Sequence, residues 1–231
     1  MVIGIIGAMA EEVESLKNVM TIEEKMTKAS MDFYEGNLWG HDVVVVVSGI
    51  GKVNAAICAQ ILVDIFDVDK IINVGVAGGV SLDANPGDIV IASSLVQHDM
   101  DCSAFGDKPG QIPRMDVFDF KCDENLVDIA RNIKLSNADH KSMVGIIATG
   151  DQFVADNVKV KWIQDTFNAA AVEMEGGSIA QVAHQNKVPF IVIRSISDNA
   201  NTGAHVDFAK FVPVAVENSM VFIKGLLENL K

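Results

Sequence analysis

The chain has 231 residues, of which 49% are hydrophobic, and it carries a formal net charge of −13. This length accommodates one large α/β domain, and because no shift of composition marks a boundary, we expect a single domain over residues 1–231. The acidic balance excludes a nucleic-acid polymer as partner, since such a partner needs a basic surface, but it allows an uncharged small molecule.

The cysteines and the N-terminus exclude further classes. Cys58, Cys102 and Cys122 are too few and too irregularly spaced for a disulfide framework, and no CxxC pair supports a zinc ribbon. The apolar start lacks the basic residues of a signal peptide, and acidic residues follow it at once. The longest aliphatic block, residues 43–47, is far too short to span a membrane. We expect a cytoplasmic protein.

Short aliphatic runs alternate with helical patterns along the chain. The runs suit strands that are covered on both faces, and they lie at residues 2–6, 43–47, 70–76, 88–96, 144–149 and 190–197. Apolar residues at helical spacing predict helices at residues 11–20, 51–66, 159–167, 175–186 and 211–231, the last with Pro213 near its first turn. This alternation predicts an α/β fold with a mostly parallel or mixed sheet and helices on both faces.

Residues 98–120 interrupt that alternation. The segment contains Pro109, Pro113 and several glycines, and it shows no sustained period. A long irregular segment in a compact domain is usually functional, and apolar residues such as Phe105 argue against a purely solvated loop. We expect a lid or a subunit contact. The segment opens with His98-Asp99-Met100-Asp101, but no partner at a recognisable spacing indicates a metal site.

Glycine-rich turns follow three of the predicted strands, at residues 4–12, 48–52 and 74–80. None completes a dinucleotide fingerprint or a Walker A loop, so each is explained by a tight strand-to-helix turn alone. Open α/β sheets nevertheless bind ligands at the carboxyl ends of their strands, where glycines let backbone approach a ligand.

Carboxylates recur at the same kind of position. Glu12 follows the first strand, Glu173 and Glu175 follow the apolar run at 169–172, and Asp198 ends the run at 190–197. A single carboxylate there is explained by capping a helix or by complementing its dipole. Recurrence at three strand ends predicts several carboxyl groups around one crevice.

The order of these motifs resembles the 5′-methylthioadenosine/S-adenosylhomocysteine nucleosidases, within the nucleoside phosphorylase-like superfamily. The resemblance covers nearly the whole chain and rests on IGIIGAMAEEV, SGIGKVNAA, INVGVAGG, PGDIVIAS, HDMDCSAFG, GQIP, TGDQFV, AVEMEG and VPFIVIRSISD. It implies a three-layer α/β/α sandwich with a central mixed sheet and a homodimer. It also implies an enzyme without cofactor or metal that hydrolyses the bond between adenine and a 5′-thioribose, in methionine salvage and the activated-methyl cycle.

This chemistry needs acidic residues, because adenine leaves only when N7 is protonated and the ribosyl carbon becomes oxocarbenium-like. The resemblance makes Glu12 the general base that activates water, and Asp198 the acid at adenine N7, oriented by Ser197. To donate a proton near neutral pH, Asp198 needs a raised pKa, which burial at a strand end can supply. Glu175 is expected to accept from the 2′- and 3′-hydroxyls of the ribose.

Other positions match the family's binding contacts. The Met174 backbone contacts the ribose, Phe153 stacks on adenine, and backbone groups of Val154 bond to the edge of the base. Gly78, in the VAGG turn, falls on a further binding position. Residues expected to line the sugar and 5′-thio pocket are Met9, Ile50 and Phe208.

Four more residues complete the expected site. Phe105 and Pro113 would come from the partner subunit and close the pocket, which gives the irregular segment a purpose. Arg194 is expected to balance the carboxylates, with Glu173 beside it.

Alternatives remain at this stage. A purine nucleoside phosphorylase is one, because EMEG also occurs among phosphorylases, but it needs cations for phosphate and Lys52 is the only basic residue in the glycine-rich turns. Val76 occupies a place where the resemblance implies serine. Hydrolysis of a 6-amino-6-deoxyfutalosine-type nucleoside could use the same carboxyls, and a nucleoside-binding module without turnover is the third alternative.

Overall fold

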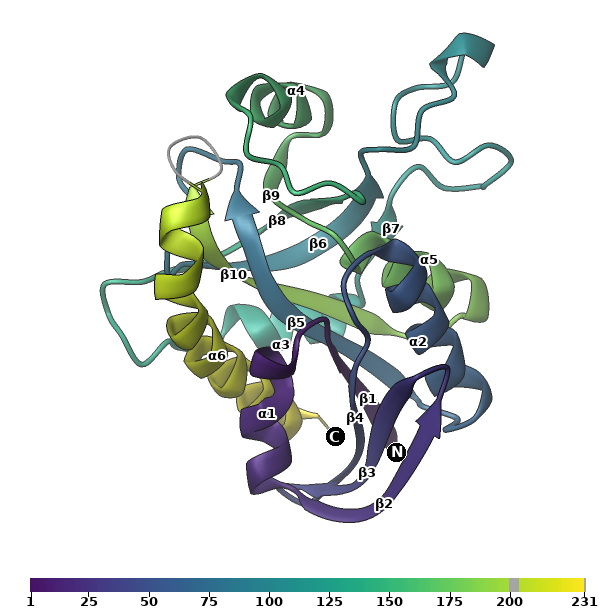
Figure 1. Cartoon of the computed structure of the whole chain (residues 1–231), viewed down its shortest axis with the longest axis vertical. Coiled ribbons are helices and arrows are strands. Elements are labelled where there is room, and N and C mark those ends of the chain that lie inside the picture. Colours follow the sequence, from purple (N-terminus) through teal and green to yellow (C-terminus); the bar gives the residue numbers. More distant parts are fainter. Residues whose placement is uncertain (200–203, 231) are drawn as a thin grey trace.

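The computed structural model describes residues 1–199 and 204–230, and for residues 199, 204–210 and 212 it describes the backbone only. Strands in this part form one ten-stranded sheet (Figure 1). They are β1 (Val2–Gly7), β2 (Thr21–Lys28), β3 (Met31–Leu38), β4 (His41–Val47), β5 (Lys70–Gly79), β6 (Ile89–Gln97), β7 (Phe120–Lys121), β8 (Ser142–Thr149), β9 (Ala169–Glu173) and β10 (Phe190–Asn199).

The sheet is mixed. Its strands follow the order β10-β6-β8-β9-β5-β1-β4-β3-β2, with β7 paired to β6. β1 runs parallel to β4 and β5, and β10 runs parallel to β5. β9 is parallel to β8 but antiparallel to β5, and β10 also pairs with β6 in the antiparallel sense. Because β10 pairs with both β6 and β5, there is a closed circuit of paired strands, which runs β5-β9-β8-β6-β10.

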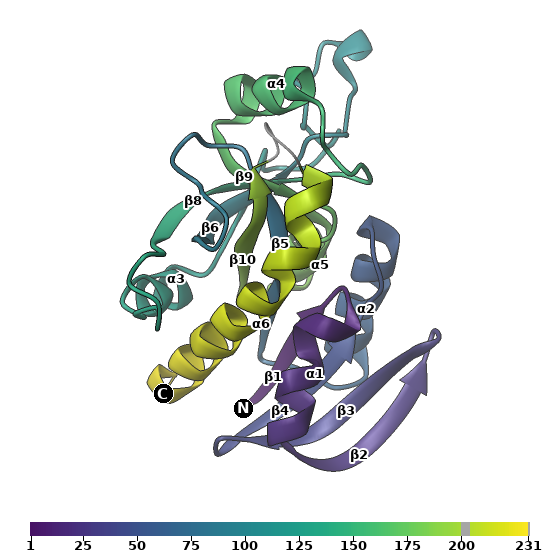
Figure 2. The ribbon, with the colours of Figure 1, turned by 60° about the vertical axis from the view of Figure 1, so that its left-hand side comes forward.

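Helices cover both faces of the sheet, which confirms the three-layer α/β/α expectation. On one face α2 (Lys52–Asp64) packs on α5 (Gly176–Asn186), and on the other α6 (Ala204–Asn229) packs on α1 (Ala10–Val19) and α3 (Glu124–Arg131) (Figures 1 and 2). α4 (Asn157–Phe167) contacts β8 and β9. No helix in the described part of the chain has both the length and the apolar character needed to cross a bilayer.

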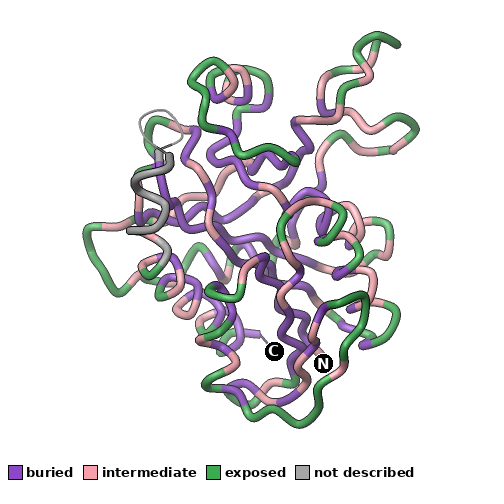
Figure 3. Tube along the Cα trace, viewed as in Figure 1, coloured by how far each residue is buried: buried purple, intermediate pink, exposed green. Residues whose placement is uncertain are grey.

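The predicted strands all overlap observed ones, because near-continuous apolar runs become strands covered on both faces. In β1 every residue after Val2 is buried, and Ile3, Ile5 and Ile6 have no exposed surface (Figure 3). The sequence analysis missed the β2–β3 hairpin and α3. β2 is an edge strand with almost every residue exposed, so it lacks the apolar pattern by which strands are recognised.

The last helix begins earlier than predicted. α6 starts at Ala204, so Pro213 lies inside the helix instead of near its first turn. A proline there removes one backbone hydrogen bond of the helix. The expectation failed because a proline is normally read as a sign of a helix start.

The segment at residues 98–120 is irregular, as predicted, apart from a short 3₁₀ helix, η1 (Ser103–Phe105), and the start of β7. It extends away from the body of the molecule at the upper right of Figure 1, and much of it is exposed in Figure 3. The side chain of Phe105 at its tip is 90% exposed. An aromatic side chain with this exposure packs little against the described part of its own chain.

The strand directions determine where a site can form. β1, β5 and β10 are parallel, so their carboxyl ends meet at one edge of the sheet. β9 ends there too, because Val172 pairs with Gly78 near the end of β5. Of the carboxylates that the sequence analysis singled out, Glu173 and Asp198 lie at the ends of β9 and β10. Glu12 lies in the first turn of α1, after β1, and Glu175 lies between β9 and α5.

Candidate active site

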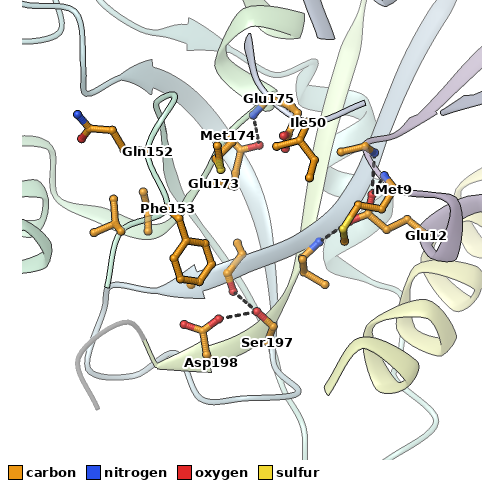
Figure 4. A pocket seen from close by; sticks show the side chains of 16 residues that line it. Met9, Glu12, Ile50, Gln152, Phe153, Glu173, Met174, Glu175, Ser197 and Asp198 are labelled. Carbon is orange, nitrogen blue, oxygen red and sulfur yellow. Dashed lines mark hydrogen bonds between the residues drawn. The ribbon is translucent and has the colours of Figure 1, made fainter. Parts of the chain in front are cut away.

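One pocket opens at this edge of the sheet, and most of the predicted site residues line it (Figure 4). Its walls come from the turn after β1, the ends of β5, β9 and β10, the turn before α2, and the segment after β8. The lining residues are Ala8, Met9, Glu12, Ile50, Val76, Ala77, Gly78, Gln152, Phe153, Val154, Val172, Glu173, Met174, Glu175, Ser197 and Asp198.

Glu12 is fixed by backbone amides. One carboxylate oxygen accepts hydrogen bonds from the N–H groups of Ala8 (2.7 Å) and Met9 (3.0 Å), and the other accepts from Val76 (3.1 Å). Desolvation outweighs these bonds and the nearby Arg194 charge, so the pKa of Glu12 is raised above its ordinary value. A buried carboxylate with a raised pKa and a fixed position is suited to accept a proton.

Arg194 lies behind the pocket wall with its side chain 1% exposed. Its Nη2 forms an ion pair with Glu173, donates to Asn73 Oδ1 at 2.7 Å and lies 3.7 Å from Glu175 Oε2. Burial by itself lowers the pKa of Arg194, but the charges of Glu173, Glu175 and Glu12 outweigh this effect and raise it. The expected balance between arginine and carboxylates is therefore present as contacts.

Gly75, in β5, permits this arrangement. A Cβ atom at this position would lie 2.2 Å from Arg194 Nη1 and 2.7 Å from Glu12 Oε1. Backbone of β5 therefore passes directly against both charged groups, and any side chain would displace one of them. The sequence analysis noted the glycine-rich turn but did not single out this glycine.

Glu173 organises the start of α5. Its Oε2 accepts from the N–H groups of Glu175 (3.0 Å) and Gly176 (2.7 Å), and its Oε1 accepts from the Thr149 hydroxyl. A carboxylate at a helix N-terminus satisfies free amides and complements the helix dipole. Together with the Arg194 ion pair, these contacts fix the backbone from which Met174 and Glu175 face the pocket.

Glu175 faces the pocket with one oxygen bound. Its Oε1 accepts from the Gly51 N–H at 2.9 Å, and its side chain is 8% exposed. Desolvation and the neighbouring Glu173 charge raise the pKa of Glu175 to about 7, although Arg194 acts in the opposite direction. Partial protonation near neutrality lets this side chain either accept or donate a hydrogen bond.

Ser197 and Asp198 both line the pocket although they are adjacent in β10. Neighbouring strand residues normally face opposite sides of a sheet. Here the register between β10 and β5 shifts between Ile196 and Asp198, which turns both side chains toward the pocket. The Ser197 hydroxyl donates to Asp198 Oδ2 at 2.7 Å, as the sequence analysis expected (Figure 4).

The opposite wall is apolar and partly open. Phe153 is 51% exposed and lines the same pocket as Asp198, while Val154 is buried (Figure 4). Ile50 is 55% exposed. A flat aromatic side chain near a carboxyl group suits a flat heteroaromatic base that both stacks and hydrogen-bonds.

Arg194, Phe105 and Pro113 are predicted site residues that are absent from this lining. Phe105 and Pro113 lie in the exposed 98–120 segment, so within one subunit they take no part in it. The side chain of Phe208 lies outside the described residues. The pocket also contains residues that the sequence analysis did not assign, notably Gln152. Gln152 belongs to the quoted TGDQFV motif, which was the only signal for it.

Among the described residues, no group of three or more His, Cys, Asp or Glu side chains is placed to hold a metal ion. Asp99, in the HDMD segment, instead forms an ion pair with Lys52 at 2.6 Å.

The chain is similar to known proteins over its whole length. Residues 2–228 match the sequence profile of the phosphorylase superfamily. A 5′-methylthioadenosine/S-adenosylhomocysteine nucleosidase of Tolumonas auensis is 42% identical over 231 residues, which is 100% of both chains. The crystal structure of such a nucleosidase from Colwellia psychrerythraea 34H, in complex with adenine, superposes with a TM-score of 0.94. It is 41% identical, and the match covers 100% of this chain and 96% of that one. A futalosine hydrolase of Helicobacter pylori superposes with a TM-score of 0.91 and 34% identity, over 100% and 98% of the two chains.

The raised pKa of Glu175 predicts a pH-dependent effect of Glu175→Gln on stability. A group whose pKa rises on folding adds stability below its unfolded value of 4.5, and this is lost as pH increases through about 7. Glutamine carries no charge, so the melting temperature of the variant should rise relative to wild type between pH 5 and pH 8. At about 1.4 kcal/mol per pKa unit, the change is on the order of 3 kcal/mol.

Thermal melts at several pH values measure this difference. The control is Glu228→Gln, at the exposed end of α6, where the difference from wild type should stay constant. A Glu175→Gln melting temperature that falls further below wild type as pH increases would contradict the assignment.

Proposed function

Because the chain belongs to the phosphorylase superfamily, and within it to the 5′-methylthioadenosine/S-adenosylhomocysteine nucleosidases, we propose that it hydrolyses the N-glycosidic bond of these two nucleosides. The products are adenine and the 5′-thioribose compound. The observation that carries this proposal is Glu12, a buried carboxylate with a raised pKa, which faces the pocket with Asp198 in the same lining.

In the reaction, Glu12 takes a proton from water as the water oxygen bonds to the anomeric carbon. The bond between that carbon and adenine N9 breaks, and its electrons pass to the base. Adenine N7 receives a proton from Asp198, so that the base leaves neutral. Glu12 then releases its proton to solvent, and Asp198 takes up a proton from solvent. No other reactant is needed.

Other residues of the pocket support the orientation of the nucleoside that this reaction requires. Glu175 has one oxygen on the Gly51 N–H and leaves acceptor capacity toward the pocket, which suits the two ribose hydroxyls. Phe153 provides a face for the adenine ring, and Val154 offers backbone groups to its edge. Met9 and Ile50 provide apolar surface for a 5′-thio substituent. Arg194 acts from behind the wall by holding Glu173 and Glu175.

Two contacts oppose phosphate as the nucleophile. The N–H groups of Ala8, Met9 and Val76, which would otherwise bind an anion, already bind the Glu12 carboxylate. Lys52, the basic residue of the glycine-rich turns, is paired with Asp99 and is hydrogen-bonded to Gln97. To bind here, phosphate would have to displace the Glu12 carboxylate from these amides and break the ion pair between Lys52 and Asp99. These contacts favour water over phosphate.

Hydrolysis of a futalosine-type nucleoside is the second candidate. The observation in its favour is the 34% identity to the Helicobacter pylori futalosine hydrolase over the full chain. Because that substrate class has the same type of N-glycosidic bond, the same three carboxyl groups could serve it.

The proposal includes a homodimer. Phe105 is 90% exposed on its extended segment, and α2 presents Val53 (69% exposed) and Ile57 (41% exposed) four residues apart on one face. Apolar surface of this kind is typical of a subunit interface. Within a dimer, Phe105 and Pro113 of one subunit would close the open side of the other subunit's pocket.

The proposal also includes a cytoplasmic location and a role in methionine salvage. Cys58, Cys102 and Cys122 are all unpaired, which suits a reducing compartment.

A phosphate-free assay tests the reaction. Purified protein is mixed with 5′-methylthioadenosine, S-adenosylhomocysteine or 6-amino-6-deoxyfutalosine, and adenine and the sugar product are quantified with and without phosphate. We expect equal adenine release in both buffers and a free thioribose, because water is the nucleophile. A strict requirement for phosphate, with a sugar 1-phosphate as product, would make the protein a phosphorylase.

Phe105→Ala tests the shared pocket. Burying a phenylalanine side chain contributes about 1.5–3 kcal/mol, so its loss should raise KM roughly 10- to 100-fold while the melting temperature changes little. Light scattering measures the assembly in parallel. Leu82→Ala, a control at another exposed apolar side chain (80%), should leave KM unchanged. A monomer with full activity would contradict the role given to Phe105.

A further inference from the structure

Three charged residues from separate segments form a closed ring beside the pocket. Lys52 is the first residue of α2, Asp99 follows β6, and Asp151 follows β8. Lys52 Nζ donates to Asp99 Oδ1 at 2.6 Å, the Asp151 N–H donates to Asp99 Oδ2 at 2.9 Å, and the Lys52 N–H donates to Asp151 Oδ1 at 2.8 Å. None of the three lines the pocket.

The ring is partly shielded from water. The side chain of Lys52 is 18% exposed and that of Asp99 is 14% exposed. Desolvation opposes ionisation of Asp99, but the contacts with Lys52 and the Asp151 N–H outweigh it and lower the pKa of this carboxyl. Lys52 is also tied to Gln97 Oε1 (3.2 Å), and Gln97 in turn donates to Gln181 of α5 at 2.7 Å. An ion pair with this burial and these partners is a fixed contact, unlike a solvated surface pair.

Each member of the ring adjoins a different part of the pocket. Gly51, next to Lys52, donates its N–H to Glu175. Asp151 directly precedes Gln152, Phe153 and Val154, which line the pocket. The segment at 151–156 has no regular secondary structure, and residues 151–153 are exposed. Such a segment needs anchors outside itself if Phe153 is to keep one position.

We propose that Lys52, Asp99 and Asp151 form a positioning unit that fixes the base-binding segment 151–154 relative to Glu175. The inference rests on the proposed function for what the segment binds, but not for the existence of the ring. The three residues do not contact the substrate themselves. They act through Gly51 and through the backbone that carries Phe153, so their loss should weaken binding of the base more than it slows the chemical step.

Lys52→Met and Asp99→Asn test the unit. Lys52→Met removes the ammonium. Asp99→Asn is nearly isosteric and keeps an acceptor for the Asp151 N–H, so it provides the test if Lys52→Met does not fold. Hydrogen exchange of peptides covering residues 150–156 is measured without ligand, together with adenine affinity and the steady-state constants. We expect faster exchange in these peptides and a KM about tenfold higher, with kcat within about threefold of wild type, because the lost contacts act on ground and transition states alike.

Two further variants complete the experiment. Lys161→Met removes an exposed ion pair with Asp165 in α4 and should change none of these quantities. Lys52→Arg keeps the charge and should restore exchange and KM toward wild type. Unchanged exchange at 150–156 in both test variants would overturn the inference, as would a lower melting temperature with an unchanged KM. The exchange measurement needs no turnover, so an inactive wild type would reject the proposed function and leave the exchange result to decide the inference.

Discussion

A buried guanidinium constrains the whole site. Arg194 lies in β10 with its side chain 1% exposed, paired with Glu173 and close to Glu175. Leaving such a charge without a partner destabilises a fold by roughly 3–5 kcal/mol, so the carboxylates, Asn73 and the glycine at position 75 all follow from its presence. Because Arg194 reaches residues on β5, β9 and the turn before α5, it also fixes the relative positions of the strand ends that form the pocket.

One guanidinium does not neutralise three carboxylates. The pKa values of Glu12 and Glu175 remain raised, mainly by desolvation, although Arg194 lies near both. The folded protein therefore holds charge that costs stability at neutral pH. This cost is typical of sites at which proton transfer takes place, because a buried carboxyl with a raised pKa is a better base than a solvated one. The backbone amides that bind the Glu12 carboxylate also fix its orientation. Because these amides already have an acceptor, they are not free to bind phosphate.

Much of the fold was predictable from the sequence because its central strands are covered on both faces. Such strands are near-continuous apolar runs, as in β1 and β4, and α1, α4 and α5 carry apolar residues at helical spacing. β2 was not predictable in this way, since an exposed edge strand has no apolar pattern. The predicted start of α6 was wrong, because a proline often marks the first turn of a helix but Pro213 lies inside this one.

Site residues that belong to a sequence motif could be predicted. Contacts between segments that are distant in the sequence could not. Glu12, Glu175 and Asp198 followed from strand ends and from the family resemblance. The closeness of Gly75 to Arg194, the register shift that turns both Ser197 and Asp198 inward, and the ring of Lys52, Asp99 and Asp151 depend on contacts between segments far apart in sequence. No local pattern encodes such contacts.

The measurement that tests this account most directly is the turnover of Glu12→Gln on 5′-methylthioadenosine without phosphate, together with its affinity for adenine. If Glu12 is the base that activates water, kcat should fall by roughly 10²- to 10⁴-fold while adenine still binds with near wild-type affinity. A variant that turns over within about threefold of wild type would show that the proton goes elsewhere, and it would contradict the central role given to this carboxylate.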